Sequence, residues 1–153
     1  MILNRQRAVR VARRPLEVFL ARVQRELGLG KADVTVCLVS DAEIARMNQT
    51  FRKKKGPTDV LSFPAAERAR PVRLPRRSGS RQRNVAGLEF LGDVAIAPAT
   101  ARRNAKKLSR ALRDELRILM LHGVLHLLGY DHETDRGKMD RVEARLRKKL
   151  RLT

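Results

Sequence analysis

Aromatic residues are scarce in this chain of 153 residues, which has no tryptophan, one tyrosine and four phenylalanines. Base stacking on aromatic side chains can therefore add little to any binding of nucleic acid, and such binding would depend on phosphate charge. The chain also lacks any apolar run long enough to form a transmembrane helix. We therefore expect no association with a membrane.

Acidic residues are also few compared with basic residues. Aspartate and glutamate number 16 against 35 lysines and arginines, which gives a net charge of +19. A charge of this size favours a polyanionic partner, namely RNA, DNA or an anionic surface. The alternative is a solvated, arginine-biased surface that has no partner.

The chain contains a single cysteine, Cys37. One cysteine excludes an internal disulfide and is typical of a reducing compartment, so we expect a cytoplasmic protein. Because Cys37 lies in the apolar run VTVCLV, residues 34–39, we expect a buried and inert thiol.

Histidine is equally rare, but all three histidines lie in the eleven residues HGVLHLLGYDH, residues 122–132. On a helix, His122 and His126 would share one face with their Cβ atoms about 5–6 Å apart. One zinc ion can bridge such a pair, and a turn with positive φ at Gly129 could bring His132 to the same ion. Three histidine ligands would leave a fourth position open, as in catalytic zinc sites. The alternative, three unrelated histidines in a leucine-rich helix, is disfavoured by their clustering.

The same spacing occurs in the metzincin proteases, H-E-x-x-H-x-x-G-x-x-H. Here the second position is Gly123, where those proteases have the glutamate that acts as general base. The expected metal ligands remain, but peptide hydrolysis loses its base.

The motif HGVLHLLGYDH resembles the signature of the YbeY family, bacterial single-strand endoribonucleases that act in ribosomal RNA maturation and ribosome quality control. Residues 51–64, FRKKKGPTDVLSFP, resemble a second signature of that family, and Gly92-Asp93-Val94 resembles a third segment. The resemblance covers residues from about 2 to 150. It implies that Arg52 occupies the position of a functionally important arginine, whereas sequence chemistry alone would make Arg52 one more surface cation.

The pattern of apolar residues predicts an α+β fold, in which a small mixed four-stranded sheet packs with about five helices in a single domain. The expected strands are 2–11, 34–39, 60–63 and 91–97, and the expected helices run over about 15–28, 40–50, from 98, 109–128 and 134–150. Residues 66–86 hold seven arginines and no apolar periodicity, so we expect a basic, flexible loop within the domain of residues 1–153. Whether this loop binds RNA stays open.

The resemblance implies a zinc-dependent endoribonuclease with one divalent metal per chain, held by His122, His126 and His132, and with Arg52 as a catalytic residue. Its expected partners are single-stranded ribosomal RNA, the ribosomal subunit and ribosomal proteins, and no DNA. Its expected roles are maturation of the 3′ end of the small-subunit ribosomal RNA and ribosome quality control. The alternatives are a non-catalytic, zinc-containing ribosome-binding factor and a metal-dependent hydrolase of another substrate class. The general base stays open, and Asp131 is one candidate for it.

Overall fold

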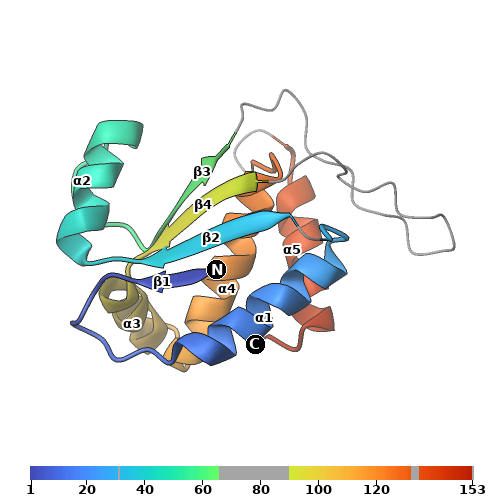
Figure 1. Ribbon diagram of the computed structural model, residues 1–153, viewed down its shortest axis with the longest axis horizontal. Helices are drawn as coiled ribbons and strands as arrows, with labels where there is room; N and C mark the ends of the chain where they lie inside the picture. Colours follow the sequence, from blue (N-terminus) through green and yellow to red (C-terminus); the bar gives the residue numbers. More distant parts are fainter. Residues whose placement is uncertain (31, 66–89, 132–134, 153) are drawn as a thin grey trace, which may run out of the picture.

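The computed structural model describes residues 1–30, 32–65, 90–131 and 135–152 (Figure 1). Within these ranges the structure has four strands and five helices. They are β1 (Ile2–Asn4), α1 (Arg13–Glu26), β2 (Asp33–Leu38), α2 (Asp41–Arg52), β3 (Val60–Pro64), β4 (Phe90–Ile96), α3 (Pro98–Lys107), α4 (Leu112–Leu127) and α5 (Lys138–Lys149). The predicted α+β class is confirmed.

The four strands form one mixed sheet in the order β1-β2-β4-β3. β1 and β2 are parallel, as are β2 and β4, whereas β3 runs antiparallel to β4 with Val60 opposite Ile96 and Pro64 opposite Gly92. β3 therefore forms one edge of the sheet, where its outer side is open to groups from other elements.

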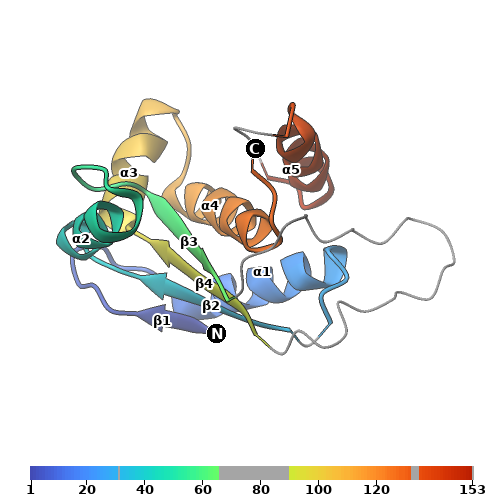
Figure 2. The same cartoon turned by 90° about the horizontal axis from the view of Figure 1, so that it is seen from above.

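Helix α4 is the centre of the core. Its second half is almost wholly apolar, and Met120, Leu121, Leu125 and Leu127 have no more than 1% of their surface exposed. A helix that is apolar on every side must be covered on every side. Figure 2 shows α4 lying between the sheet and α5, and α1 and α3 also contact it. The backbone of α4 is thus held in the core of the molecule.

Helix α2 stands at one end of the sheet (Figure 1). Its Ile44 packs in a second, smaller cluster with Leu61 of β3 and Ala95 of β4. Side chains of a strand alternate between faces, and Val94 and Ile96 belong to the main core, so Ala95 and α2 lie on the opposite face. Ser40 begins α2 as expected, since its Oγ accepts a hydrogen bond from the backbone N–H of Glu43 at 3.1 Å.

The expected strand over residues 2–11 is wrong beyond Asn4. The side chain of Gln6 replaces the pairing of a strand there, because its amide accepts from the N–H of Val9 at 2.9 Å and donates to the carbonyl of Val9 at 2.8 Å. A local side-chain bridge of this kind competes with the ladder of a sheet. The basic loop expected at 66–86 lies outside the described residues. No helix in the described part of the chain is long and apolar enough to cross a membrane.

Candidate active site

The two histidines of α4 point their ring nitrogens at each other. The Nε2 atoms of His122 and His126 are 3.1 Å apart, and the two rings meet edge to face with centroids 4.6 Å apart. α4 ends at Leu127, and the chain turns after it as expected at Gly129, which has a φ of 94°, in the region that favours glycine. The predicted pairing of these two side chains on one helical face is therefore present. His132, the third expected ligand, lies outside the described residues.

The histidine pair fits a divalent metal ion. Zinc binds imidazole nitrogen at about 2.0–2.1 Å, so two ligands of one tetrahedral ion are separated by about 3.3 Å. The 3.1 Å between the two Nε2 atoms is close to that separation. Imidazole is also the ligand that first-row metals such as zinc favour. Among the described residues alone, however, no group of three or more potential ligands could hold a metal.

Gly123 lies between the histidines and packs against the sheet. A Cβ atom at this position would lie 2.5 Å from Cγ1 of Val94, which is closer than side chains approach in proteins. The hydroxyl of Ser62 on β3 donates to the carbonyl of Gly123 at 2.9 Å. Glycine is thus required for α4 to lie this close to β3 and β4, and a glutamate here would separate the helix from the sheet.

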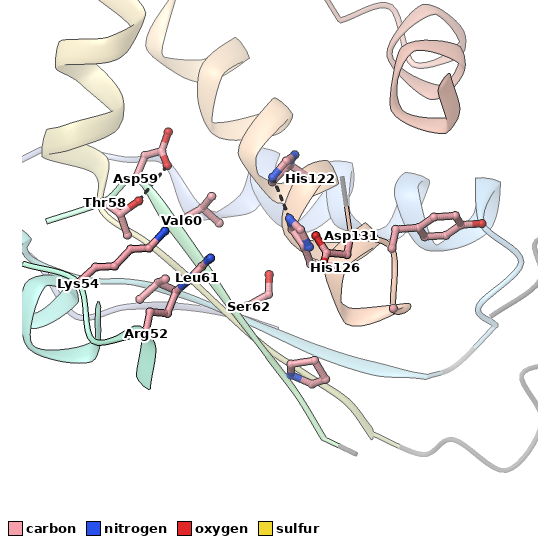
Figure 3. A pocket seen from close by; sticks show the side chains of 13 residues that line it. Arg52, Lys54, Thr58, Asp59, Val60, Leu61, Ser62, His122, His126 and Asp131 are labelled. Carbon is pink, nitrogen blue, oxygen red and sulfur yellow. Dashed lines mark hydrogen bonds between the residues drawn. The ribbon is translucent and has the colours of Figure 1, made fainter. Parts of the chain in front are cut away.

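A cavity of about 500 Å³ opens beside the histidines (Figure 3). Three parts of the chain line it: the end of α2 and the loop that follows, strand β3, and α4 with the turn after it. The lining residues are Arg52, Lys54, Thr58, Asp59, Val60, Leu61, Ser62, Pro64, His122, His126, Gly129, Tyr130 and Asp131. The structure therefore brings Arg52 and the two histidines to one cavity, although 70 or more residues separate them in the sequence.

Arg52 is the last residue of α2 and is exposed in the cavity wall. Figure 3 shows Arg52 and Lys54 on one side of the β3 ribbon and the two histidines on the other. Within the described part of the chain, neither cation forms an ion pair with a carboxylate. Both cations are thus available to a negatively charged ligand in the cavity.

The start of α2, at the end of the helix opposite Arg52, is tied to α3. Asp41 accepts hydrogen bonds from Thr100 at 2.7 Å and from Arg103 at 2.8 Å. Burial alone would raise the pKa of Asp41, but these hydrogen bonds and the Arg103 charge outweigh it and lower the pKa below its usual value. α2 is therefore anchored at one end and carries the cation of the site at the other.

Two further pKa shifts come mainly from burial. Burial raises the pKa of the Tyr130 hydroxyl, so the tyrosine in the cavity wall is an uncharged hydrogen-bonding group. Burial and the nearby Asp93 raise the pKa of the Cys37 thiol, which favours the unreactive form. Cys37 is half-buried rather than buried as expected, because it lies on the sheet face that α2 covers only in part.

Two acids near the histidines have different positions. Asp135 accepts a hydrogen bond from the backbone N–H of Met139 at 2.9 Å, so it caps the start of α5 as expected from its position. Asp131 is exposed and lines the cavity, where it stays a candidate general base.

Sequence reasoning missed Glu143. This residue of α5 places Oε1 at 3.3 Å from Nδ1 of His122, 21 positions away in the sequence. A signal was present, because Glu143 follows Met139 by four residues and precedes Leu146 by three. It thus lies on the apolar stripe of an amphipathic helix, where an acid is unusual.

The family model for endoribonuclease YbeY matches residues 2–151 of this sequence. The chain belongs to the YbeY family. The endoribonuclease YbeY of Solibacter usitatus is 43% identical over 148 residues, which cover 96% of this chain and 86% of that protein. The endoribonuclease YbeY of Koribacter versatilis is 38% identical over 152 residues, which cover 99% and 86%.

The fold is also similar to that of solved structures. The solution structure of TM1509 from Thermotoga maritima matches with a TM-score of 0.61 and 26% sequence identity, over 98% of this chain and 89% of that chain. The resemblance to the YbeY family found in the sequence is thus confirmed, and family membership supports an endoribonuclease that acts on RNA. The roles of Arg52, His122, His126 and His132 stay predictions.

Proposed function

We propose that this YbeY-family protein is a zinc-dependent endoribonuclease that cleaves single-stranded ribosomal RNA. We place it in maturation of the 3′ end of the small-subunit ribosomal RNA and in ribosome quality control, with the ribosomal subunit and its proteins as partners. A substrate of this kind implies a cytoplasmic location. The observation that carries the proposal is the pair of Nε2 atoms 3.1 Å apart in a cavity that also holds Arg52 and Lys54.

His122, His126 and His132 would hold one zinc ion per chain. When bound, zinc supplies Lewis acidity and a nucleophile near neutral pH. His122 and His126 come from a helix whose other sides pack in the core, which gives the site the rigidity that catalysis requires.

Arg52 would bind the phosphate that is cleaved. Its guanidinium presents a planar fork of N–H donors that matches two phosphate oxygens and offsets the charge that develops on them. Lys54 adds a second positive charge to the same wall. Asp59 lines the cavity from the loop just before β3 and Asp131 from the turn after α4, so the chain supplies two candidate proton acceptors.

Within the alternative of a metal-dependent hydrolase of another substrate class, Gly123 argues against a peptide substrate. The glutamate that would act as general base in peptide hydrolysis has no room at this position, because even a Cβ atom would meet Val94. The other alternative, a non-catalytic ribosome-binding factor, would use zinc only for its structure.

Metal-dependent cleavage of a labelled single-stranded RNA tests the proposal. The purified protein should contain about one zinc per chain by elemental analysis, cleave the RNA, lose cleavage on chelation and regain it on addition of zinc. A single-stranded DNA of the same sequence and a peptide should stay intact. The His122→Ala/His126→Ala variant should lose both metal and cleavage while circular dichroism shows a folded chain.

Two results would contradict this proposal. RNA binding without cleavage by the zinc-loaded protein would favour the ribosome-binding factor. Metal retained in the doubly substituted variant would remove the histidines from the site.

A further inference from the structure

Helix α5 places a carboxylate, that of Glu143, next to Nδ1 of the proposed metal ligand His122, the ring nitrogen that does not face His126. Both oxygens of Glu143 face Nδ1 of His122, with Oε1 at 3.3 Å and Oε2 at 3.5 Å. Only 15% of the Glu143 side chain and 25% of the His122 side chain are exposed. The contact thus lies in a largely water-excluded place between two helices.

A carboxylate at this position needs a partner. Glu143 lies on the same side of α5 as Met139 and Leu146, whose side chains are buried in the core. Placing a charged group in such surroundings costs free energy unless hydrogen bonds compensate. Within the described residues, the His122 imidazole is the hydrogen-bond partner that the structure shows for Glu143.

The hydrogen bond decides which nitrogen of His122 is open to a metal. A neutral imidazole has one N–H donor and one nitrogen that carries a lone pair. If Nδ1 carries the hydrogen and donates it to Glu143, the lone pair lies on Nε2, the atom that faces Nε2 of His126. Histidines that bind metals commonly donate their second N–H to a carboxylate in this way.

We propose that Glu143 is a positioning residue for the metal site: it fixes the tautomer and the ring orientation of His122, so that Nε2 is directed at the ion. This inference rests on the proposed zinc site. Glu143 touches neither substrate nor metal, and its effect passes through His122.

A purely structural role would give a different result, because α5 has other contacts that hold it in place. Lys149 forms an ion pair with Glu26 of α1 at 2.7 Å, and Met139, Leu146 and Leu150 are buried. Removal of the Glu143 carboxylate should therefore leave α5 docked. If Glu143 served only to dock the helix, its loss would change the stability of the fold and leave zinc affinity unaltered.

The test measures zinc affinity of the full chain by competition with a chromophoric chelator. We expect Glu143→Ala to weaken zinc binding by about 10- to 100-fold, the range found for such partners. Glu143→Gln should weaken it less, because an amide oxygen still accepts the Nδ1 hydrogen but carries no charge. Asp140→Asn is the matched control, since it removes the same charge from an exposed position on the same helix. It should leave zinc affinity unchanged.

Imidazole nitrogen NMR of the zinc-free protein gives a second readout. His122 should carry its hydrogen on Nδ1 in the wild-type protein and become a mixture of tautomers in Glu143→Ala. Equal zinc affinity of Glu143→Ala and wild type, an equal loss in Asp140→Asn, or an unchanged tautomer would each overturn the inference while the proposed function stands. If Glu143→Ala does not fold, wild-type zinc affinity in Glu143→Gln would overturn it. A wild-type protein that binds no zinc would overturn the inference and the zinc site together.

Discussion

Gly123 shows what a single missing side chain does for the site. Because it lacks a Cβ atom, α4 lies against Val94 and accepts the hydrogen bond from Ser62. The two histidines, one immediately before Gly123 and one three positions after it, are thereby set at a fixed depth beside β3. The motif around the histidines therefore encodes packing as well as the proposed metal ligands.

Gly123→Ala should destabilise the fold. Overpacking costs about 1–3 kcal/mol, whereas alanine gains about 1 kcal/mol over glycine in a helix, so a net loss of about 1 kcal/mol is expected. Guanidinium unfolding measures it. In a Val94→Ala background the same change should no longer destabilise the fold and should keep the gain of up to about 1 kcal/mol from alanine, because the obstructing methyl groups are gone. An equal loss in both backgrounds would show that the contact with Val94 is not the cause.

Arg52→Ala should separate catalysis from binding. Loss of one charge-stabilising donor at an active site costs on the order of 10²–10³ in rate. RNA affinity should fall far less, because Arg52 is one of 35 basic residues that attract the strand. Single-turnover cleavage at saturating enzyme, beside a binding titration at fixed salt, measures both.

Two further variants sharpen the Arg52 experiment. Arg52→Lys should restore little cleavage, because an ammonium lacks the planar fork. Arg46→Ala is the matched control, since Arg46 is an exposed arginine on the same helix and does not line the cavity. Equal losses of cleavage and of binding in Arg52→Ala would make Arg52 an ordinary surface cation.

At the scale of elements, α2 links the fold to the site through Asp41. Its folded-state pKa lies below the usual value of 3.8, so its contribution to stability is present above about pH 4 and is lost as pH falls through the folded-state pKa. The contribution of Asp41 to the free energy of unfolding should be under about 1 kcal/mol. The reason is that its side chain is partly exposed and the side chain of its partner Arg103 is more exposed still.

Asp41→Asn should therefore lower the free energy of unfolding near neutral pH, and the difference from wild type should shrink as the pH falls below 3.8. Urea unfolding of Asp41→Asn and of the wild-type protein, at pH 7 and at pH 3, measures the difference in the free energy of unfolding at each pH. Asp140→Asn on α5, which removes an exposed carboxylate, is the control and should show a smaller change at pH 7. A difference for Asp41→Asn that grows at low pH would contradict the assignment.

Most elements were predictable because their signals are local. The buried half of α4 follows from its apolar composition, and the start of α2 follows from Ser40, which caps it. The prediction of a strand over residues 2–11 was wrong beyond Asn4, because the side chain of Gln6 forms hydrogen bonds with the backbone of Val9. The alternation of apolar residues does not reveal such a hydrogen bond. The position of Glu143 on the apolar stripe of α5 is visible in the sequence, but its contact with His122 could not be predicted. That contact depends on how α5 packs against α4, and local sequence patterns do not predict the packing of two helices.

The sequence pointed to the histidine pair and to Arg52, but not to most of the other residues that line the cavity. The pair follows from the i, i+4 spacing on a helix, and Arg52 was expected from the family resemblance. Thr58, Asp59 and Ser62 came to the cavity wall only through the position of β3 at the edge of the sheet. That position depends on strand order, which the sequence did not reveal.

For the whole molecule, the net charge of +19 should dominate binding of RNA. For single strands the logarithm of the affinity falls with the logarithm of salt with a slope of about −0.7 per phosphate contacted. If about five phosphates are bound, the slope is about −3.5. Fluorescence anisotropy with a labelled RNA between 50 and 200 mM salt, about the physiological range, measures the slope. A flat response would show that hydrogen bonding or stacking, rather than charge, holds the strand.

The order of the elements along the chain has a consequence for biosynthesis. Arg52 is made early, the histidines of α4 late and Glu143 later still, yet Arg52 and the histidines line one cavity and Glu143 contacts His122. At about 5–20 residues per second, the 91 residues from Arg52 to Glu143 take roughly 5–18 s to translate. A nascent chain therefore carries Arg52 well before the helices that complete the proposed cleavage centre have been made.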